Sequence, residues 1–203
     1  MGRGGAGVLP AALQRWGWLR YIAQMSIVST RPHAQAPDFS TPDFRLALGH
    51  FATGVTIVTT RAPDGRWVGL TANSFNAVSL SPPLVLWSLA QGSGSLPAFQ
   101  AATHYGVHVL TADQRALAER FATRDVDRFA GLDVRTGPGG VPLLAGCAAV
   151  FTCFNRSRYP EGDHVIFVGE VEHCQQDPQA APLLYHRGRF LPPAAHPAPL
   201  GVG

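Results

Sequence analysis

A cluster of small, neutral polar side chains lies at residues 69–75, where the chain reads Gly-Leu-Thr-Ala-Asn-Ser-Phe. Thr71, Asn73 and Ser74 place two hydroxyls and one amide within four residues, and such groups hydrogen-bond a polar ligand without carrying charge. Apolar segments flank the cluster on both sides, so it falls between two expected strands. The pattern predicts a ligand site built on a β-sheet. Ordinary turn chemistry at a strand end would explain the same residues, and this segment alone does not separate the two interpretations.

A second polar segment, Gln-Gly-Ser-Gly-Ser at residues 91–95, precedes a short expected helix. Ser93 and Ser95 would offer an anion their hydroxyls and the backbone N–H groups at the positive end of that helix. A flexible connection has the same composition. His164 stands at the start of another expected strand, either as a ligand contact or as an ordinary surface histidine. The eight histidines show no spacing typical of a metal site, so we expect no metal.

Short strands must position these groups. Residues 55–61 are rich in β-branched side chains, and a Pro-Asp-Gly turn at 63–65 leads into a second strand at 67–70. Because no strand–helix–strand alternation appears, the pattern predicts a mainly β fold, an antiparallel β-barrel with peripheral α-helices. Further strands are expected at 84–89, 105–110, 148–154 and 164–171, with a turn at 159–162, and helices are expected to begin at Thr41, Ser95 and Thr111.

The composition excludes several functional classes. A chain of 203 residues with 46% hydrophobic side chains is long enough for one domain with a core. Residues 39–203 contain twelve arginines and twelve acids, so this part is electrically neutral and no nucleic acid is expected as a partner. Arg124, Asp125, Asp127 and Arg128 are expected to form a solvated charge cluster. No apolar run reaches the roughly 18–20 residues of a transmembrane helix, so no membrane is expected either.

Cysteine usage indicates the compartment. The three cysteines, Cys147, Cys153 and Cys174, are too few for a disulfide scaffold, and their spacing fits no zinc ligand set. Reduced, mostly buried thiols are typical of a cytoplasmic protein, which is the localisation we expect.

The two ends of the chain differ from its middle. Residues 1–38 contain a single acid and predict a flexible or poorly structured extension, or alternatively an arginine-containing targeting peptide. Residues 191–203 are proline-rich and predict a disordered tail. Residues 39–190 are therefore the expected folded domain.

Several segments, taken together in their order and spacing, resemble a known family. They are Phe-Arg-Leu-Ala-Leu-Gly-His-Phe-Ala-Thr-Gly-Val at 44–55, the cluster at 69–75, Arg-Phe-Ala at 120–122 followed by Asp-Arg-Phe at 127–129, and Gly-Asp-His at 162–164. The chain resembles the flavin reductase family with the FMN-binding split-barrel fold, the reductase components of two-component flavin-dependent monooxygenases. The resemblance implies an antiparallel split barrel that forms a homodimer. It also implies flavin, as FMN or FAD, as the cofactor, NADH or NADPH as the co-substrate, and a monooxygenase as the partner.

The resemblance also implies roles for individual residues. His108 stands where family members usually have an asparagine, which puts one polar contact on that strand in question. By the resemblance, the isoalloxazine edge and ribityl chain would be held by Thr71, Ala72, Asn73 and Ser74, and the side of the ring would meet Ser88 and Leu89. The phosphate would be bound by Ser93 and Ser95, with Phe121 and Ala122 closing over it. His164 would face the nicotinamide side of the ring and is the catalytic candidate.

The expected reaction is hydride transfer from C4 of NADH or NADPH to N5 of the flavin. The cofactor supplies the electronics, and the protein supplies stacking, orientation and hydrogen bonds. Two further functions fit the same residues: a non-catalytic flavin-binding or delivery protein, and an FMN-dependent oxidase on a related split barrel. A barrel that serves only as an oligomeric scaffold is a third alternative.

Overall fold

The computed structural model describes residues 35–191, so nearly all of the predicted extension at 1–38 and tail at 191–203 lies outside the described residues. Residues 35–40 contain no helix or strand, and the elements from Thr41 onward belong to one compact unit. The helices are α2 (Thr41–Leu48), α3 (Leu96–Ala101), η1 (Ala112–Gln114), α4 (Arg115–Ala122) and η2 (Pro138–Gly140). The strands are β1 (Thr53–Gly54), β2 (Thr56–Arg61), β3 (Trp67–Ala72), β4 (Asn76–Leu80), β5 (Pro83–Ala90), β6 (His104–Val109), β7 (Val134–Thr136), β8 (Pro142–Leu144), β9 (Ala149–Glu161), β10 (His164–Gln176), β11 (Leu184–His186) and β12 (Arg189–Phe190).

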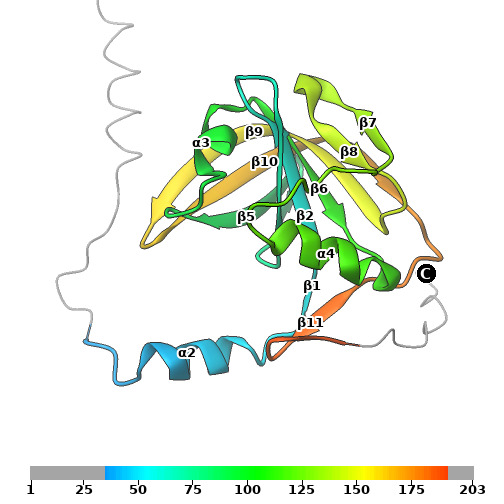
Figure 1. Cartoon of the computed structure of the whole chain (residues 1–203). Helices are drawn as coiled ribbons and strands as arrows, with labels where there is room; N and C mark the ends of the chain where they lie inside the picture. Colours follow the sequence, from blue (N-terminus) through cyan, green and yellow to red (C-terminus); the bar gives the residue numbers. More distant parts are fainter. Residues whose placement is uncertain (1–34, 192–203) are drawn as a thin grey trace, which may run out of the picture. The chain divides into compact units, whose positions relative to one another are not determined.

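Seven strands form one antiparallel sheet in the order β3-β2-β6-β9-β10-β5-β4 (Figure 1). Its two edge strands, β3 and β4, are consecutive in the chain, so the sheet must curl until they approach each other. The side chain of Ser74 fixes this closure, because its hydroxyl donates to the carbonyl of Ser88 at 3.1 Å and accepts from the Ser88 N–H at 2.9 Å. The predicted antiparallel split barrel is confirmed.

β2 lies between β3 and β6 in the sheet and is buried from Thr56 to Thr60. Its β-branched side chains suit a pleated surface, and each of its threonine hydroxyls finds a backbone carbonyl. Thr56 donates to Ala72, Thr59 to Pro142 and Thr60 to His104, at 2.6–2.8 Å. The strand therefore buries three hydroxyls without leaving a donor unpaired.

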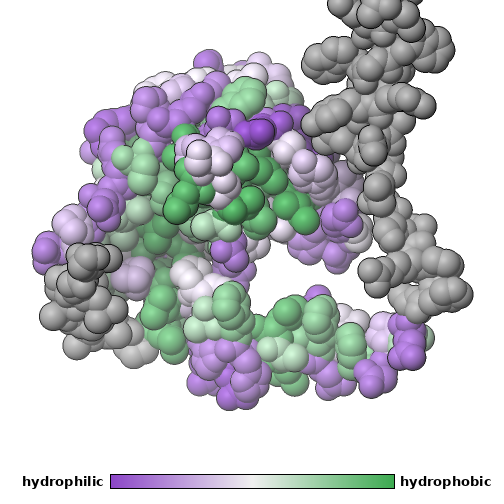
Figure 2. Space-filling view, turned by 180° about the vertical axis from the view of Figure 1, so that it is seen from behind, coloured by the Kyte–Doolittle hydropathy of each residue, from purple (hydrophilic) through white to green (hydrophobic). Residues whose placement is uncertain are grey.

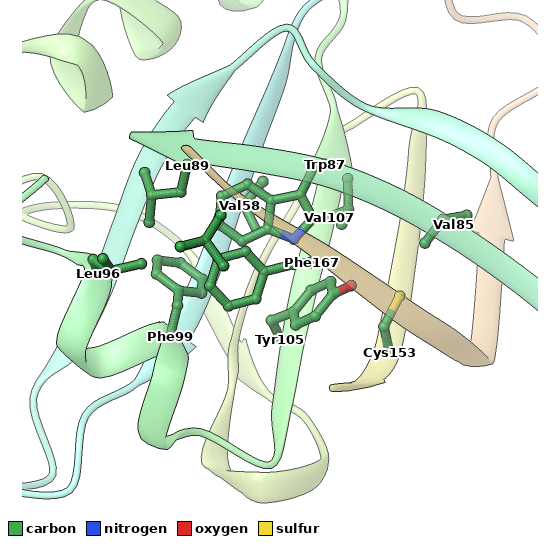
Figure 3. Close-up of a cluster of buried hydrophobic side chains, with 11 residues drawn as sticks. Val58, Val85, Trp87, Leu89, Leu96, Phe99, Tyr105, Val107, Cys153 and Phe167 are labelled. Atoms are coloured by element: carbon green, nitrogen blue, oxygen red, sulfur yellow. The ribbon is translucent and has the colours of Figure 1, made fainter. Parts of the chain in front are cut away.

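Aromatic side chains fill the interior of the barrel (Figure 3). The indole of Trp87 stacks on Phe167 with ring centroids 4.8 Å apart and meets Phe99 edge to face at 4.9 Å. Phe99 belongs to α3, which Asn155 ties to β9 by donating to the carbonyls of Phe99 and Ala102 at 2.8 and 3.0 Å. The core thus fixes α3 beside the loop that follows β5.

α4 packs against β2 and β3 over a second apolar cluster that contains Ile57, Leu110 and Phe121. The helix was predicted to begin at Thr111, and there the Thr111 and Gln114 side chains form a capping box on η1, which runs directly into α4 at Arg115. The side chains thus replace the missing backbone partners of the first helical turn.

One predicted turn is wrong. β9 runs on to Glu161, so the turn is at Gly162 and Asp163 and not at 159–162. Pro160 is tolerated inside the strand because the pairing of β6 with β9 ends at Phe154, which leaves β9 as an edge on that side.

The helix predicted to begin at Thr41 is present as α2, and apolar side chains are exposed on its surface (Figure 2). Leu46 is 70% exposed and Leu48 is 57% exposed. An apolar face is typical of a helix that packs against a core, and here none of its residues is buried.

Candidate functional site

A groove of about 1270 Å³ lies between three segments that are distant in the sequence. They are the β2–β3 hairpin at 62–69, the end of β5 with the start of α3 at 89–98, and the loop after α4 at 124–129. The structure places Leu89, Ser93 and Ser95 in its lining, as three of the residues predicted to contact a ligand.

The two serines belong to a tightly folded turn. The Ser93 hydroxyl accepts a hydrogen bond from the Ser95 N–H at 3.3 Å. The Ser93 carbonyl accepts one from the Leu96 N–H at 3.0 Å. Ser95 precedes α3, and its side chain makes no capping bond to the helix. Because α3 has only six residues and a proline in its first turn, the hydroxyls matter more for an anion here than the helix dipole does.

The tip of the β9–β10 hairpin lies beside this serine turn. His164 pairs with Ala90 in the sheet, and Gln91 donates to the carbonyls of Asp163 and Gly162 at 2.9 and 3.0 Å. The ring of His164 is about half exposed and its Nδ1 lies 2.7 Å from Asp163 Oδ1. The hydrogen bond with His164 and its charge lower the pKa of the Asp163 carboxyl. His164 is thus oriented at the edge of the site without lining the groove.

The predicted cluster at 71–74 is used differently from what its residue types suggest. Thr71 donates to the carbonyl of Ala118 in α4 at 2.6 Å, and the Ser74 hydroxyl is occupied by Ser88. Asn73 is exposed. Residues 71–74 do not line the groove, and neither do Ser88 and His164. Of the three polar side chains in the cluster, those of Thr71 and Ser74 join elements of the fold.

Phe121 packs against two residues that line the groove, Gly69 and Phe129. It is fully buried, and a Cβ built on Gly69 would lie only 2.6 Å from its Cε1 atom. Its ring also meets Phe129, a lining residue, edge to face at 5.1 Å. Ala122 is exposed at the end of α4. Phe121 therefore acts on the groove through Phe129 and the β3 backbone.

Arg128 lines the groove and anchors its loop, which the sequence did not reveal. Its guanidinium donates to the Thr123 carbonyl through Nε and Nη2, at 3.1 and 2.7 Å, and to the Gly69 carbonyl through Nη1, at 2.9 Å. The expected solvated charge cluster is therefore wrong at this position, since Arg128 anchors the loop to β3. The only available signal was its place between an aspartate and an aromatic residue in a segment that resembles the family.

Trp67 was also not predicted. It is the first residue of β3, lines the groove and is 41% exposed. Its ring meets Phe129 at 5.6 Å. A tryptophan in a strand is ordinary, so only the position of the hairpin in space shows that it borders the site.

His108 contacts no part of the groove. It is fully buried, its Nδ1 donates to the Ile57 carbonyl at 3.0 Å, and its Nε2 accepts from the Leu144 N–H at 3.1 Å. Burial lowers the pKa of this ring to about 4. The departure from the family pattern therefore joins β2, β6 and β8 inside the fold.

Two further observations concern residues 35–191. No group of three or more His, Cys, Asp or Glu side chains in this range is arranged to hold a metal ion. No helix in the same range is long and apolar enough to cross a membrane.

Comparison with known proteins gives consistent matches. Residues 48–193 match the flavin reductase like domain family. The FMN reductase (NADH) SmoA of Agrobacterium fabrum is 50% identical over 147 residues, which are 72% of this chain and 83% of that protein. The reductase subunit HsaB of a flavin-dependent monooxygenase from Rhodococcus jostii is 40% identical over 159 residues, which are 77% of this chain and 81% of that protein.

A solved structure gives the same result. The NADH:FAD oxidoreductase of Streptomyces globisporus, in complex with NAD and FAD fragments, is 36% identical with a TM-score of 0.72, and the match covers 83% of this chain and 99% of that one. These likenesses confirm the predicted fold and the predicted activity class, an NAD(P)H:flavin oxidoreductase. By sequence and by fold, the chain belongs to the flavin reductase-like domain family.

Proposed function

We propose that the groove binds the flavin, FMN or FAD, and that NADH or NADPH reduces it there. One observation carries this assignment. A single groove gathers Leu89, Ser93 and Ser95, and hydrogen bonds from Gln91 hold the hairpin tip that bears His164 against the same turn.

The lining fits a flavin chemically. Val68 and Leu89 give apolar surface for the flavin ring system, and the Ser93 and Ser95 hydroxyls suit a phosphate. Pockets for small ligands usually combine an apolar wall with a few placed polar groups in this way. The same wall excludes water from one side of a bound ring.

The residues of the chain bind and orient, and a bound flavin would supply the electron-accepting ring. We propose that the flavin ring extends from the groove to the end of β3, where the exposed Asn73 amide and the backbone at 72–73 hold its edge outside the groove lining. The Thr71 and Ser74 hydroxyls are already bonded within the fold. His164, which Asp163 orients, would contact the nicotinamide. Holding two rings in reacting geometry contributes on the order of 7–11 kcal/mol in well-oriented cases, so no acid or base is required.

We further propose that the reduced flavin passes to a partner monooxygenase, as the names of the relatives suggest, and that the chain acts as a cytoplasmic homodimer. Large apolar side chains on two elements support a second copy: Leu46 and Leu48 on α2, and Leu80 on β4, which is 94% exposed. Light scattering on the purified full chain tests the dimer, and a monomer at micromolar concentration would contradict it.

The activity is tested by mixing the purified chain with NADH or NADPH and excess FMN or FAD, and following the nicotinamide absorbance. Consumption above the protein-free blank with at least one pair is expected. Flavin binding without consumption would instead identify a delivery protein, and consumption that requires an amine substrate would identify an oxidase.

The position of the flavin has its own test. Ser95→Ala should weaken the binding of FMN more than that of riboflavin, which lacks the phosphate. Ser79→Ala removes a hydroxyl on β4 outside the groove and serves as the control. Equal losses for FMN and riboflavin in Ser95→Ala would refute the phosphate assignment.

A further inference from the structure

Trp67 lines the groove at a position to which the proposed flavin contacts assign no role. It opens β3 on the wall formed by the β2–β3 hairpin, away in the sequence from the serine turn. Its 41% exposure leaves a large part of the indole in contact with solvent. Contact of this exposed indole surface with a flat apolar ligand would be favourable.

The indole is held in place by a chain of aromatic contacts. Phe129 meets Trp67 at 5.6 Å with an interplanar angle of 61°, and Phe121 meets Phe129 at 5.1 Å and 81°. Gly69 lies two residues after Trp67 and so faces the same side of β3, where its missing Cβ admits the Phe121 and Phe129 rings. Arg128 ties the loop that carries Phe129 to the Gly69 carbonyl. Trp67 is therefore a preorganised surface rather than a freely moving side chain.

The charged side chains that line the groove balance one another, so its net charge does not select a ligand. Three arginines and three aspartates line it, and Arg66 pairs with Asp64 at 2.7 Å on the hairpin itself. Arg128 is committed to backbone carbonyls. Recognition at this end of the groove therefore depends on the aromatic surface more than on electrostatic attraction.

The size of the groove points in the same direction. Its volume of about 1270 Å³ exceeds the roughly 300–1,000 Å³ of an ordinary small-molecule pocket. A ligand whose phosphate meets Ser93 and Ser95 leaves room along the hairpin wall, and a second nucleotide half would occupy it.

We propose that Trp67 stacks on the adenine of a dinucleotide bound in the groove, with FAD as the expected ligand. The proposal rests on the assignment of the flavin to this groove. Stacking of a base on an aromatic side chain is sequence-tolerant and is lost on substitution by alanine. Removing it should weaken binding by roughly 5- to 100-fold. The chain should accordingly bind FAD more tightly than FMN.

The test compares dissociation constants measured by flavin fluorescence for the wild type, Trp67→Ala and Trp67→Phe. Trp67→Ala should weaken FAD binding by at least fivefold while FMN binding changes less than twofold, and Trp67→Phe should restore most of the FAD affinity. Tyr159→Ala is the matched control, since Tyr159 is 43% exposed on β9 and does not line the groove. Far-ultraviolet circular dichroism checks that each variant is folded.

A second arm separates the two sources of adenine. With FMN saturating, an increase in KM for NADH in Trp67→Ala, without any change in flavin binding, would assign the stacked adenine to the nicotinamide dinucleotide. An equal loss of FMN and FAD affinity, or no change in any of these constants, would overturn the proposal. A wild-type chain that binds neither flavin would instead overturn the flavin site itself, so the two failures are distinguishable.

Discussion

The Ser74 hydroxyl bonds both backbone groups of Ser88, 14 residues away, accepting from its N–H at 2.9 Å and donating to its carbonyl at 3.1 Å. One side chain thus takes the place of a strand partner on the β4 side of β5, where the pairing of β4 with β5 ends at Leu86. The two segments that the family resemblance assigns to the flavin ring are joined at this point.

Ser74→Ala should destabilise the fold and weaken flavin binding together. The variant leaves the Ser88 N–H and carbonyl without their partner, which costs on the order of 1–3 kcal/mol for a half-buried site. Urea unfolding gives the free energy of unfolding, and fluorescence titration gives the flavin dissociation constant. Ser79→Ala, which removes one acceptor of a local hydrogen bond, is the control. A free energy of unfolding of Ser74→Ala equal to that of the wild type would show that the Ser74 bridge contributes nothing.

Gly69→Ala should be strongly unfavourable. The new methyl group would lie 2.6 Å from Phe121 and 3.2 Å from Phe129, and overpacking of this kind costs about 1–3 kcal/mol. Displacing these rings should also shift Trp67 and change its fluorescence maximum. Gly54→Ala is the matched control because no atom lies within 4 Å of its added Cβ. A melting temperature of Gly69→Ala equal to that of Gly54→Ala would contradict the packing argument.

Arg128→Lys should loosen the loop at 123–129. A lysine ammonium is a point charge and does not reproduce the fork that reaches the Thr123 and Gly69 carbonyls together. Backbone amides of this loop should exchange hydrogen faster by mass spectrometry, and flavin affinity should fall. Arg135→Lys, an exposed change on β7 outside the groove, is the control. Unchanged exchange at 123–129 would show that the guanidinium does not anchor the loop.

His108 should make the fold acid-sensitive. Its pKa is about 4 in the folded chain and 6.5 in its ordinary state, so the unfolded chain binds more protons between these values. The free energy of unfolding therefore carries the full contribution of neutral, buried His108 above pH 6.5. This contribution, on the order of 3 kcal/mol, is lost as the pH falls towards 4. His108→Asn removes the titrating group, and its free energy of unfolding should fall less steeply over this range. Parallel curves for the variant and the wild type would rule the mechanism out.

Local sequence patterns predicted the elements that depend on local physics. The β-branched run of β2, the turn before β3 and the capping box of Thr111 and Gln114 are all present. β4 was missed because its Val78 and Leu80 are exposed, so no buried alternation marks it. The position of the β9–β10 turn was missed because Pro160 is tolerated only where β9 has lost its neighbour, which is a tertiary property.

The site was predicted less completely for a related reason. Residue types indicate which groups are able to bond a ligand, but not whether the fold has already used them. Thr71 finds its acceptor 47 residues away, and Arg128 finds the Gly69 carbonyl 59 residues away. Leu89, Ser93 and Ser95 lie together in the lining of the groove because they are close in the chain, at the end of β5 and in the turn that follows it.

The three cysteines differ in ways that suit the protein to covalent labelling. Burial raises the pKa of the Cys147 thiol to about 11 and that of Cys153 to about 12, whereas Cys174 is exposed on β10. A maleimide reacts with the thiolate of an accessible cysteine, so the unaltered chain should take up one label, at Cys174. A fluorophore would thus be attached at one known position on β10 without any engineered substitution.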